Sequence, residues 1–376
     1  MIEADVAVIG GGIAGASAAA FLAPHRQVVL LEREDQPGYH ASGRSAALFT
    51  ETYGNAVVRA LTVASRPFLS SPPLGFAEHP LLTPRGALHV GTAGDEPWLD
   101  ALLADTSALV ASVRAVAGTE ARRILPALKR DWVRGGVFEP DAQDIDTHAC
   151  IQGFLRLART HGAKVMTRAE VGAIECSGGR WQIGTSGGQV MAGIVVNASG
   201  AWADVIAGMA GVPRRGLQPK RRTAFLFAPP DGMDVRDWPI CIGPHETCYF
   251  KPDAGMILGS PADESPSEPT DAQPEELDIA IAADRIQEIA DLPIRRIARS
   301  WAGLRTFAPD RTPVVGFDPT AKGFFWLAGQ GGYGFQTAPA LAAVAAGLIV
   351  SGTIPQPVAD LGVTAEHLSP ERLAPA

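Results

Sequence analysis

The first 32 residues contain the feature that most restricts how this chain can fold. Residues 5–9 form an apolar run, and the glycine-rich turn Gly-Gly-Gly-Ile-Ala-Gly follows at residues 10–15. An Ala-rich run of strong helix formers comes next and ends at Pro24, and a second apolar run, residues 27–31, ends on Glu32. Strand, glycine turn, helix, strand and acid is the order of a dinucleotide-binding βαβ unit.

Each part of this unit has a physical role. Gly10 permits the tight turn, Gly12 lets the backbone approach a pyrophosphate, and Gly15 lets the helix pack close to the strand. The helix N-terminus offers unpaired N–H groups to phosphates, and Glu32 can accept hydrogen bonds from a ribose. The alternative is a glycine turn in another kind of α/β fold.

Composition narrows the class of protein. A chain of 376 residues is long enough for two lobes, and its net charge of -8 argues against nucleic-acid binding. Four cysteines without CxxC spacing indicate neither a zinc site nor a disulfide framework, so we expect no metal and a cytoplasmic location. The N-terminus has acidic residues where a signal peptide needs positive charge, and the longest apolar stretch, residues 338–350, is too short to span a bilayer. Membrane association is therefore not indicated.

Three further stretches of small residues could meet the same ligand. Residues 42–47 read Ser-Gly-Arg-Ser-Ala-Ala, which suits a backbone lying against a flat molecule, although an exposed loop is an equal alternative. A wholly apolar strand, residues 194–196, runs into the turn Asn197–Trp202. A third glycine turn, residues 329–334, feeds a long Ala-rich helix from Gln336 to about Val350.

The remaining pattern mixes helices and short strands. Asp146 is a good N-cap for a helix that Gly162 ends, and a single helix is expected over residues 98–117. The proline-rich residues 67–84 predict an irregular connection. Alternating runs at 171–175, 181–185 and 189–192 predict a β-meander, and a separate antiparallel sheet is expected from residues 223–228, 247–251 and 255–259.

Taken together, these motifs make the sequence resemble the FAD-dependent D-amino acid oxidase/dehydrogenase superfamily. The resemblance rests on VAVIGGGIAGASAA with Glu32, the GRSA stretch, the turn at 197–202, WAGLR at 301–305, and GQGGYG followed by a helix. The stretches EREDQPGYH, GLQPKRRTAF, KPDAGMILGSPA and FFWLAGQGGYGFQT are more closely similar to the catabolic D-arginine dehydrogenases.

The resemblance implies an α/β, two-lobed flavoprotein. A Rossmann-like FAD-binding domain would comprise residues 1–86, 146–218 and 300–376, and a substrate domain with an antiparallel sheet would comprise residues 87–145 and 219–299. No cysteine lies near the later flavin-contacting turns, because Cys241 and Cys248 both precede Trp301, so we expect FAD to be held non-covalently.

It also implies roles for individual residues. Arg222 and Arg305 would hold the substrate carboxylate, Tyr53 and Tyr249 would line the pocket, and the carbonyls of Gly331 and Gly332 would take the amine. The residues implied at the cofactor are Gly10, Gly12, Ile13, Ala14, Gly15, Glu32, Arg33, Gly43, Arg44, Ser45, Ala46, Ala47, Val171, Ala198, Gly200, Trp202, Gly303, Arg305, Gly329, Gly331, Gly332, Tyr333, Gly334 and Gln336.

The local sequence supports the carboxylate-binding role more strongly for Arg305 than for Arg222. Arg305 follows an apolar run and should be partly buried, where a guanidinium needs an anionic partner. Arg222 sits in Lys220-Arg221-Arg222, and spacing alone does not choose among the three. No histidine pair or triad has ligand spacing, so no chemistry is assigned to any of the eight histidines.

Two positions depart from the D-arginine pattern. Ala87 stands where D-arginine-specific relatives have an acid, and Leu48 stands where they have a histidine. With Ile242 and Thr50, these residues would line the side-chain pocket and favour neutral or hydrophobic side chains. The segment Thr50–Asn55 could be a mobile lid that carries Tyr53 over the substrate. Glu51 in this lid could then swing inward and replace the acid that is missing at position 87; the alternative is a fixed turn with Glu51 in solvent.

These observations predict an FAD-dependent dehydrogenase. It would deaminate D-amino acids to 2-oxo acids and ammonia by hydride transfer to flavin N5, with an electron acceptor other than oxygen. The alternatives are an amine oxidase of the glycine/sarcosine type, a flavin-binding protein without turnover, and an NAD-binding protein.

Overall fold

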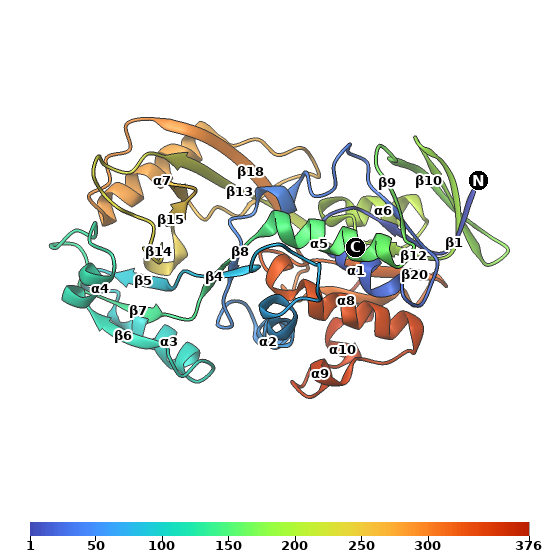
Figure 1. The fold of residues 1–376 in the computed structure, drawn as a ribbon, viewed down its shortest axis with the longest axis horizontal. Coiled ribbons are helices and arrows are strands. Elements are labelled where there is room, and N and C mark those ends of the chain that lie inside the picture. The colour runs from blue at the N-terminus through green and yellow to red at the C-terminus, as the bar shows by residue number, and fades with distance from the viewer. Residues whose placement is uncertain (376) are drawn as a thin grey trace.

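The computed structural model describes residues 1–375, and two separate sheets organise it (Figure 1). The first sheet has eight strands in the order β10-β11-β12-β1-β2-β9, with β20 beside β12 and β19 beside β20. Its strands are β1 (Ile2–Ile9), β2 (Val28–Leu31), β9 (Lys164–Met166), β10 (Val171–Ser177), β11 (Arg180–Thr185), β12 (Gly188–Asn197), β19 (Val314–Phe317) and β20 (Phe324–Ala328).

The predicted βαβ unit forms the centre of this sheet. Strand β1 pairs in parallel with β2 and with β12, and helix α1 (Ile13–Leu22) connects β1 to β2. Helices α1, α5 (Thr147–Thr160) and α8 (Gly334–Val350) bury one face of the sheet, and α6 (Ala203–Met209) packs on the other. Side chains along β1 alternate between these two cores, as a strand covered on both faces requires.

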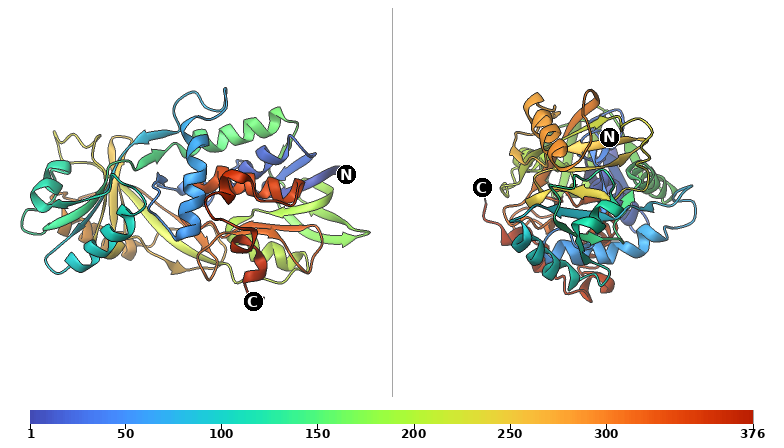
Figure 2. Two further views of the ribbon diagram at one scale, coloured as in Figure 1. Left: turned by 90° about the horizontal axis from the view of Figure 1, so that it is seen from below. Right: turned by 90° about the vertical axis from the view of Figure 1, so that its left-hand side faces the viewer.

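The second sheet has nine strands and lies at the opposite end of the molecule (Figures 1 and 2). Its order is β17-β13-β16-β15-β14-β5-β7-β6, with β18 beside β13, and all pairs are antiparallel except β14 with β5. The strands are β5 (Ala87–Gly91), β6 (Arg114–Ala117), β7 (Gly135–Glu139), β13 (Gln218–Phe227), β14 (Ile240–Ile242), β15 (Tyr249–Asp253), β16 (Met256–Ser260), β17 (Ser265–Pro266) and β18 (Ile297–Phe307).

The two faces of this second sheet have different surroundings. Helices α4 (Gly118–Ile124) and α7 (Glu276–Ile289) cover the outer face, where Phe225, Phe250 and Ile257 are buried. The inner face carries a smaller apolar cluster that includes Ala87, Ala224 and Tyr249. This inner face is the one that contributes residues to the site described below.

Shorter elements connect the two sheets. A three-stranded sheet of β3 (Leu48–Phe49), β8 (Gln143–Ile145) and β4 (Leu82–Pro84) lies between them, beside α2 (Ala56–Ser70). The other elements are α3 (Glu96–Ser107), α9 (Gln356–Ala359), α10 (Ala365–Leu368), and the 3-10 helices η1 (Ala41–Arg44), η2 (Gly200–Trp202), η3 (Pro244–Glu246) and η4 (Pro370–Arg372). The expected α/β, two-lobed fold with an antiparallel sheet is confirmed; the expected domain boundary at residue 300 falls inside β18.

Three details of the predicted secondary structure were wrong. The single helix expected over 98–117 is helix α3 followed by strand β6, because residues 114–117, which include the β-branched Val116, pair with β7. Part of the irregular connection expected over 67–84 is helical, because Pro67 occupies the last turn of α2. The runs at 189–192 and 194–196 form one continuous strand, β12.

The helix signals at Asp146 were correct. The Asp146 side chain accepts a hydrogen bond from the Ala149 N–H, and Gly162 adopts a φ of +87° just beyond the end of the helix. Among the described residues, no helix combines the length and apolarity needed to cross a bilayer.

Candidate active site

The glycine turn after β1 is packed so tightly that it excludes side chains. Gly10 has a φ of +105°, and a Cβ there would lie 2.5 Å from the Ala198 carbonyl oxygen. A Cβ at Gly15 would collide with the Gly10 carbonyl, so α1 can approach β1 only without a side chain at that position. Gly12 is the N-cap of α1 and has no side chain to cap the helix, so the Ser42 hydroxyl accepts a hydrogen bond from the Ile13 N–H at 3.0 Å, and the first turn of α1 lines the cavity.

Glu32 closes the adjacent strand and is held in place by the backbone. Its Oε2 accepts a hydrogen bond from the Gly11 N–H at 2.7 Å, and its Oε1 accepts one from the Glu34 N–H at 2.9 Å. Burial raises the pKa of Glu32, and these two backbone N–H groups oppose that rise. The carboxylate is thereby fixed at the mouth of the glycine turn.

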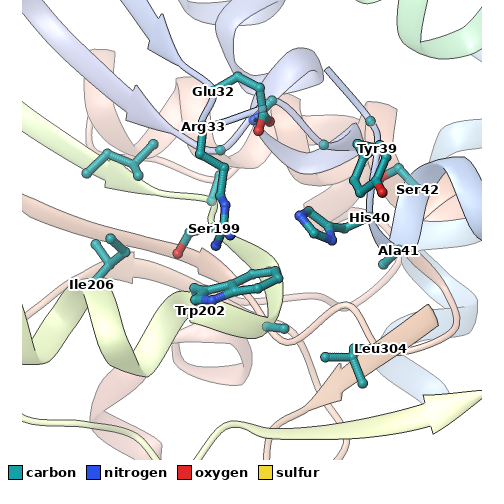
Figure 3. A pocket seen from close by; sticks show the side chains of 18 of the residues that line it. Glu32, Arg33, Tyr39, His40, Ala41, Ser42, Ser199, Trp202, Ile206 and Leu304 are labelled. Atoms are coloured by element: carbon teal, nitrogen blue, oxygen red, sulfur yellow. Dashed lines mark hydrogen bonds between the residues drawn. The ribbon is translucent and has the colours of Figure 1, made fainter. Parts of the chain in front are cut away.

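A group of flat side chains lies opposite Glu32 (Figure 3). The Arg33 guanidinium lies 4.6 Å from the centre of the Trp202 ring, and the His40 ring centre lies 4.7 Å from that of Trp202. His40 Nε2 is also 2.8 Å from the Glu34 carboxylate. Sequence analysis assigned His40 no role, since its ring partner Trp202 is distant in the sequence.

Two adjoining cavities run from this group toward the second sheet. The first is lined by Gly10, Gly12, Glu32, Arg33, Arg44, Val171, Ala198, Gly200, Trp202 and Gly303 among the predicted cofactor residues. The second shares Gly12, Arg44, Ala198, Gly200 and Gly303 with it and adds Ile13, Ala14, Ser45, Ala46, Ala47, Leu48, Arg222, Tyr249, Arg305, Gly331, Gly332, Gly334 and Gln336. The shared lining makes one elongated site that extends from Glu32 to Tyr249.

The structure distinguishes among the three basic residues of β13. Alternation along the strand turns Arg221 away to Glu275 and Asp278, while Arg222 lines the cavity and its Nε donates to the Asp263 carbonyl at 2.8 Å. Lys220 binds Glu264 at 3.0 Å and Arg222 Nη2 lies 3.4 Å from the same carboxylate, but Lys220 is not part of the cavity lining. Arg222 is therefore the cavity-facing cation that spacing alone could not choose.

Arg305 joins Arg222 from the neighbouring strand. Strands β13 and β18 are paired so that Arg222 lies opposite Gly303 and Lys220 opposite Arg305, which places the two guanidiniums diagonally on one face. Burial and the nearby Arg305 charge lower the pKa of Arg222. Two cations facing one cavity favour an anion there.

Two tyrosines surround this pair of cations. Burial opposes the charge of Arg305, but Tyr53, Tyr249 and Glu264 outweigh burial and raise the pKa of Arg305. Burial likewise disfavours ionisation of Tyr249, but Arg305 and Arg222 outweigh it and lower the pKa of the Tyr249 phenol. The cations and phenols therefore form one electrostatic group.

Several predicted site residues lie behind the lining. Gly15 and Gly43 pack against backbone, Gly329 forms the turn after β20, and the Tyr333 ring lies 5.0 Å from that of Tyr53. Gln336 reaches the second cavity, but its side-chain amide donates to the Thr62 hydroxyl at 2.8 Å. Ala87 and Ile242 share the inner-face apolar cluster with Leu48 and Tyr249.

The segment Thr50–Asn55 is tied to its surroundings at four places. The hydroxyls of Thr50 and Thr52 bind Glu139, Glu51 binds Arg66 at 2.6 Å, and the Asn55 amide donates to the Thr312 hydroxyl at 2.9 Å. These contacts favour a fixed turn over a mobile lid, and they direct Glu51 to helix α2. Glu139 is a further residue that sequence analysis missed.

The cysteines are unsuited to a covalent link. Burial raises the pKa of Cys150 to about 12 and that of Cys248 to about 11, and Cys241 is also buried. Cys176 is exposed and lies outside both cavities. Among the described residues, no group of three or more His, Cys, Asp or Glu side chains is arranged to hold a metal.

The site fits an extended dinucleotide. Its floor at Gly10 and Gly12 has no side chain, the N-terminus of α1 faces the cavity, and an acid and stacked flat side chains mark one end. The other end, beside Ser45–Ala47 and the two arginines, is the part available for a second ring system and an anionic substrate.

Comparison with known proteins agrees with this site. The family model described as FAD dependent oxidoreductase (DAO) matches residues 5–348. Glycine oxidase of Geobacillus kaustophilus is 22% identical over 365 residues, which cover 92% of each chain. FAD-dependent oxidoreductase domain-containing protein 1 of Xenopus laevis is 28% identical over 179 residues, and the match spans 35% of that protein's length.

Solved structures share the fold. L-proline dehydrogenase from P. horikoshii superposes with a TM-score of 0.81 at 23% identity, over 99% of this chain and 98% of that one. Glycine oxidase from Geobacillus kaustophilus superposes with a TM-score of 0.82 at 21% identity, over 93% and 95% of the two chains. With the family model covering most of its length, this chain belongs to the DAO family of FAD-dependent oxidoreductases.

Proposed function

We propose that this protein is a dehydrogenase that oxidatively deaminates D-amino acids with neutral or hydrophobic side chains. The observation that carries the proposal is the convergence of Arg222 and Arg305 on the same cavity as the glycine turns. A carboxylate placed between the two guanidiniums would gain charge-assisted hydrogen bonds. The products would be a 2-oxo acid and ammonia.

The chain's own residues would orient the substrate. Arg222 and Arg305 would hold the carboxylate, the phenols of Tyr53 and Tyr249 would pack over it, and the carbonyls of Gly331 and Gly332 would accept hydrogen bonds from a neutral amine. These contacts fix the direction of the Cα–H bond. Bound FAD supplies the acceptor for that hydrogen as hydride.

The side-chain preference rests on the apolar cluster on the inner face of the second sheet, from which Leu48 and Tyr249 line the second cavity while Ala87 and Ile242 pack behind them. Leu48, Ala87 and Ile242 lie in one cluster with Tyr249, and none of the three offers an acceptor to a cationic substrate side chain. The nearby acids are engaged elsewhere, Glu51 by Arg66 and Glu139 by Thr50 and Thr52. Non-covalent attachment of FAD, a cytoplasmic location and an acceptor other than oxygen are further parts of the proposal.

A panel of substrates tests this function. The purified holoenzyme would be mixed anaerobically with the D- and L-forms of leucine, methionine, phenylalanine, arginine and proline, and with glycine and sarcosine, and flavin bleaching recorded. We expect bleaching by neutral D-amino acids. Bleaching by L-forms alone would contradict the configuration, and no bleaching by any amine would contradict the enzyme class.

A second candidate is an amine oxidase of the glycine/sarcosine type. It is favoured by the similarity to glycine oxidase, because the alignment covers 92% of each of the two chains. Steady oxygen consumption with glycine or sarcosine, without an added electron acceptor, would support it over the dehydrogenase.

A further inference from the structure

Glu139, at the end of β7, is a buried acid for which the proposed reaction has no use. Its side chain is 6% exposed, and no Arg, Lys or His among the described residues forms an ion pair with it. Burial raises the pKa of its carboxyl, the hydroxyls of Thr52 and Thr50 oppose that rise, and the charges of Glu51 and Asp141 add to it. An acid buried without a cation is costly, so its presence points to a task.

The Glu139 carboxyl and the hydroxyls of Thr50 and Thr52 are all hydrogen-bonded to one another. The Thr50 Oγ1 lies 2.9 and 2.8 Å from the two carboxyl oxygens, and the Thr52 Oγ1 lies 2.7 Å from Oε2. The two hydroxyl oxygens are 2.9 Å apart, and the Thr52 N–H donates to the Thr50 Oγ1 at 3.3 Å. Glu139 therefore holds both ends of the three-residue segment Thr50–Thr52.

This turn leads directly to the substrate end of the site. Leu48 lines the second cavity just before it, and Tyr53 follows it. The Tyr53 hydroxyl is near enough to the Arg305 guanidinium to help raise the pKa of that arginine. The Tyr53 ring packs with Phe307, two residues beyond Arg305 on β18, and lies 5.0 Å from the ring of Tyr333, so the position of the ring depends on the turn before it and on these two neighbours.

We propose that Glu139 is a positioning residue: through Thr50 and Thr52 it holds the Tyr53 hydroxyl against Arg305 and so sets how tightly the site binds a carboxylate. The inference rests on the proposed function, because it takes the carboxylate as the part of the substrate that Arg305 holds. Glu139 itself touches neither the guanidinium nor the proposed substrate carboxylate; its effect passes through Tyr53.

A different reading places Glu139 in contact with the substrate side chain. It lies directly opposite Ala87 in the pairing of β5 with β7, so both side chains project from the same face of the sheet. The two readings make different predictions. A side-chain contact changes the choice among amino acids, whereas positioning of Tyr53 changes the affinity for every carboxylate.

The test is a double-mutant cycle that measures binding of a simple carboxylate rather than turnover. Benzoate, which has no amine and no aliphatic side chain, would be titrated into the holoenzyme while the flavin absorbance is recorded. We expect the benzoate Kd to rise about tenfold in Glu139→Leu and about tenfold in Tyr53→Phe. In the double variant we expect a Kd within twofold of that of Tyr53→Phe alone, because Glu139 has no effect once the Tyr53 hydroxyl is absent.

Conservative variants separate positioning from a general loss of structure. Glu139→Gln keeps an acceptor oxygen for the threonines, so its Kd should stay within threefold of native. Thr52→Val keeps the shape but loses the hydroxyl, so it should resemble Glu139→Leu and carries the same cycle if Glu139→Leu does not retain FAD. Asp141→Asn is the matched control on an exposed acid near Glu139 and should leave the Kd unchanged.

Three outcomes would overturn the inference. The effects of Glu139→Leu and Tyr53→Phe could multiply in the double variant, or Glu139→Leu could alter the choice between D-leucine and D-arginine with an unchanged benzoate Kd. A native protein that does not bind benzoate would overturn the carboxylate clamp itself. If benzoate shows the expected coupling while no amino acid bleaches the flavin, the positioning role stands and the proposed reaction fails.

Discussion

The absence of a side chain at Gly332 creates the space in which the Arg305 guanidinium lies. A Cβ built on Gly332 would be 2.8 Å from Nη1 and 3.0 Å from Cζ of Arg305, closer than such atoms pack. Both residues line the same cavity, although 27 positions separate them in the sequence. The glycine is therefore needed for the cation as well as for the turn.

Gly332→Ala should weaken substrate binding through this contact. The added methyl would push the guanidinium out of its position, so we expect the substrate KM to rise at least tenfold while FAD stays bound. Steady-state kinetics with the best D-amino acid, together with the flavin spectrum, would measure this. An unchanged KM would mean that Arg305 adapts without loss.

Arg305→Met should cost far more. Loss of one partner leaves the substrate carboxylate incompletely paired, a penalty of roughly 3–5 kcal/mol. The KM should rise by orders of magnitude with FAD retained, and Arg222→Met should behave alike. Arg221→Met is the matched control, since Arg221 faces away toward Asp278. A change of less than about threefold in Arg305→Met would contradict the clamp.

The flavin should be released by acid. Burial raises the thiol pKa of Cys150, Cys241 and Cys248, which makes these cysteines unreactive. None of the four cysteines lines the two cavities. Precipitation with acid should therefore leave the yellow colour in the supernatant. Colour retained in the protein pellet would show a covalent link.

Substrate choice should follow the apolar cluster at Ala87. An apolar side chain gains roughly 0.8 kcal/mol for each buried CH₂, whereas a guanidinium there would lose its water without finding a partner. Turnover per KM for D-leucine, D-methionine and D-phenylalanine should exceed that for D-arginine, and Ala87→Glu should favour D-arginine most. Native turnover of D-arginine tenfold above every neutral substrate would contradict this, and Glu51→Gln would then be the next variant.

His89 should make the protein sensitive to mild acid. Burial lowers the pKa of His89 to about 4, and its Nδ1 has no hydrogen-bond partner among the described residues. The folded-state pKa of His89 is below the unfolded value of 6.5, so the buried neutral ring contributes fully to the free energy of unfolding above pH 6.5. That contribution is lost as the pH falls toward 4, because the unfolded chain takes up a proton that the folded protein does not. Between pH 7 and pH 4 the free energy of unfolding should fall by about 3 kcal/mol less in His89→Gln than in the native protein, as measured by urea unfolding. Parallel curves for the two proteins would contradict it.

Local signals in the sequence predicted the glycine turn, the acid after the second strand and the helix cap that the structure shows. The glycines at 10, 12 and 15 act within one turn, and Glu32 follows at a fixed distance, so their roles follow from short-range geometry. The Asp146 cap was predictable for the same reason.

The substrate end depends on contacts that spacing cannot predict. The sequence does not distinguish Arg222 from Arg221, because the pairing of β13 with β18 determines which of the two arginines faces the cavity. Glu139 meets Thr50 and Thr52 from 87 to 89 positions away, and His40, which follows β2, meets Trp202, which follows β12 of the same sheet. No motif marks such pairs, because the fold alone brings them together.

The strand β18 has a consequence for how the enzyme could move. It carries Gly303 at the wall of the cofactor cavity and Arg305 two residues later, and it is paired with β13, which carries Arg222. A rigid ladder therefore sets the spacing between the cofactor wall and both cations. Hinge motion between the lobes could open a path to the solvent, but it could not separate the backbone positions that carry the two cations without breaking that ladder, so the pairing of β13 with β18 places Arg222 and Arg305 close together before any substrate arrives.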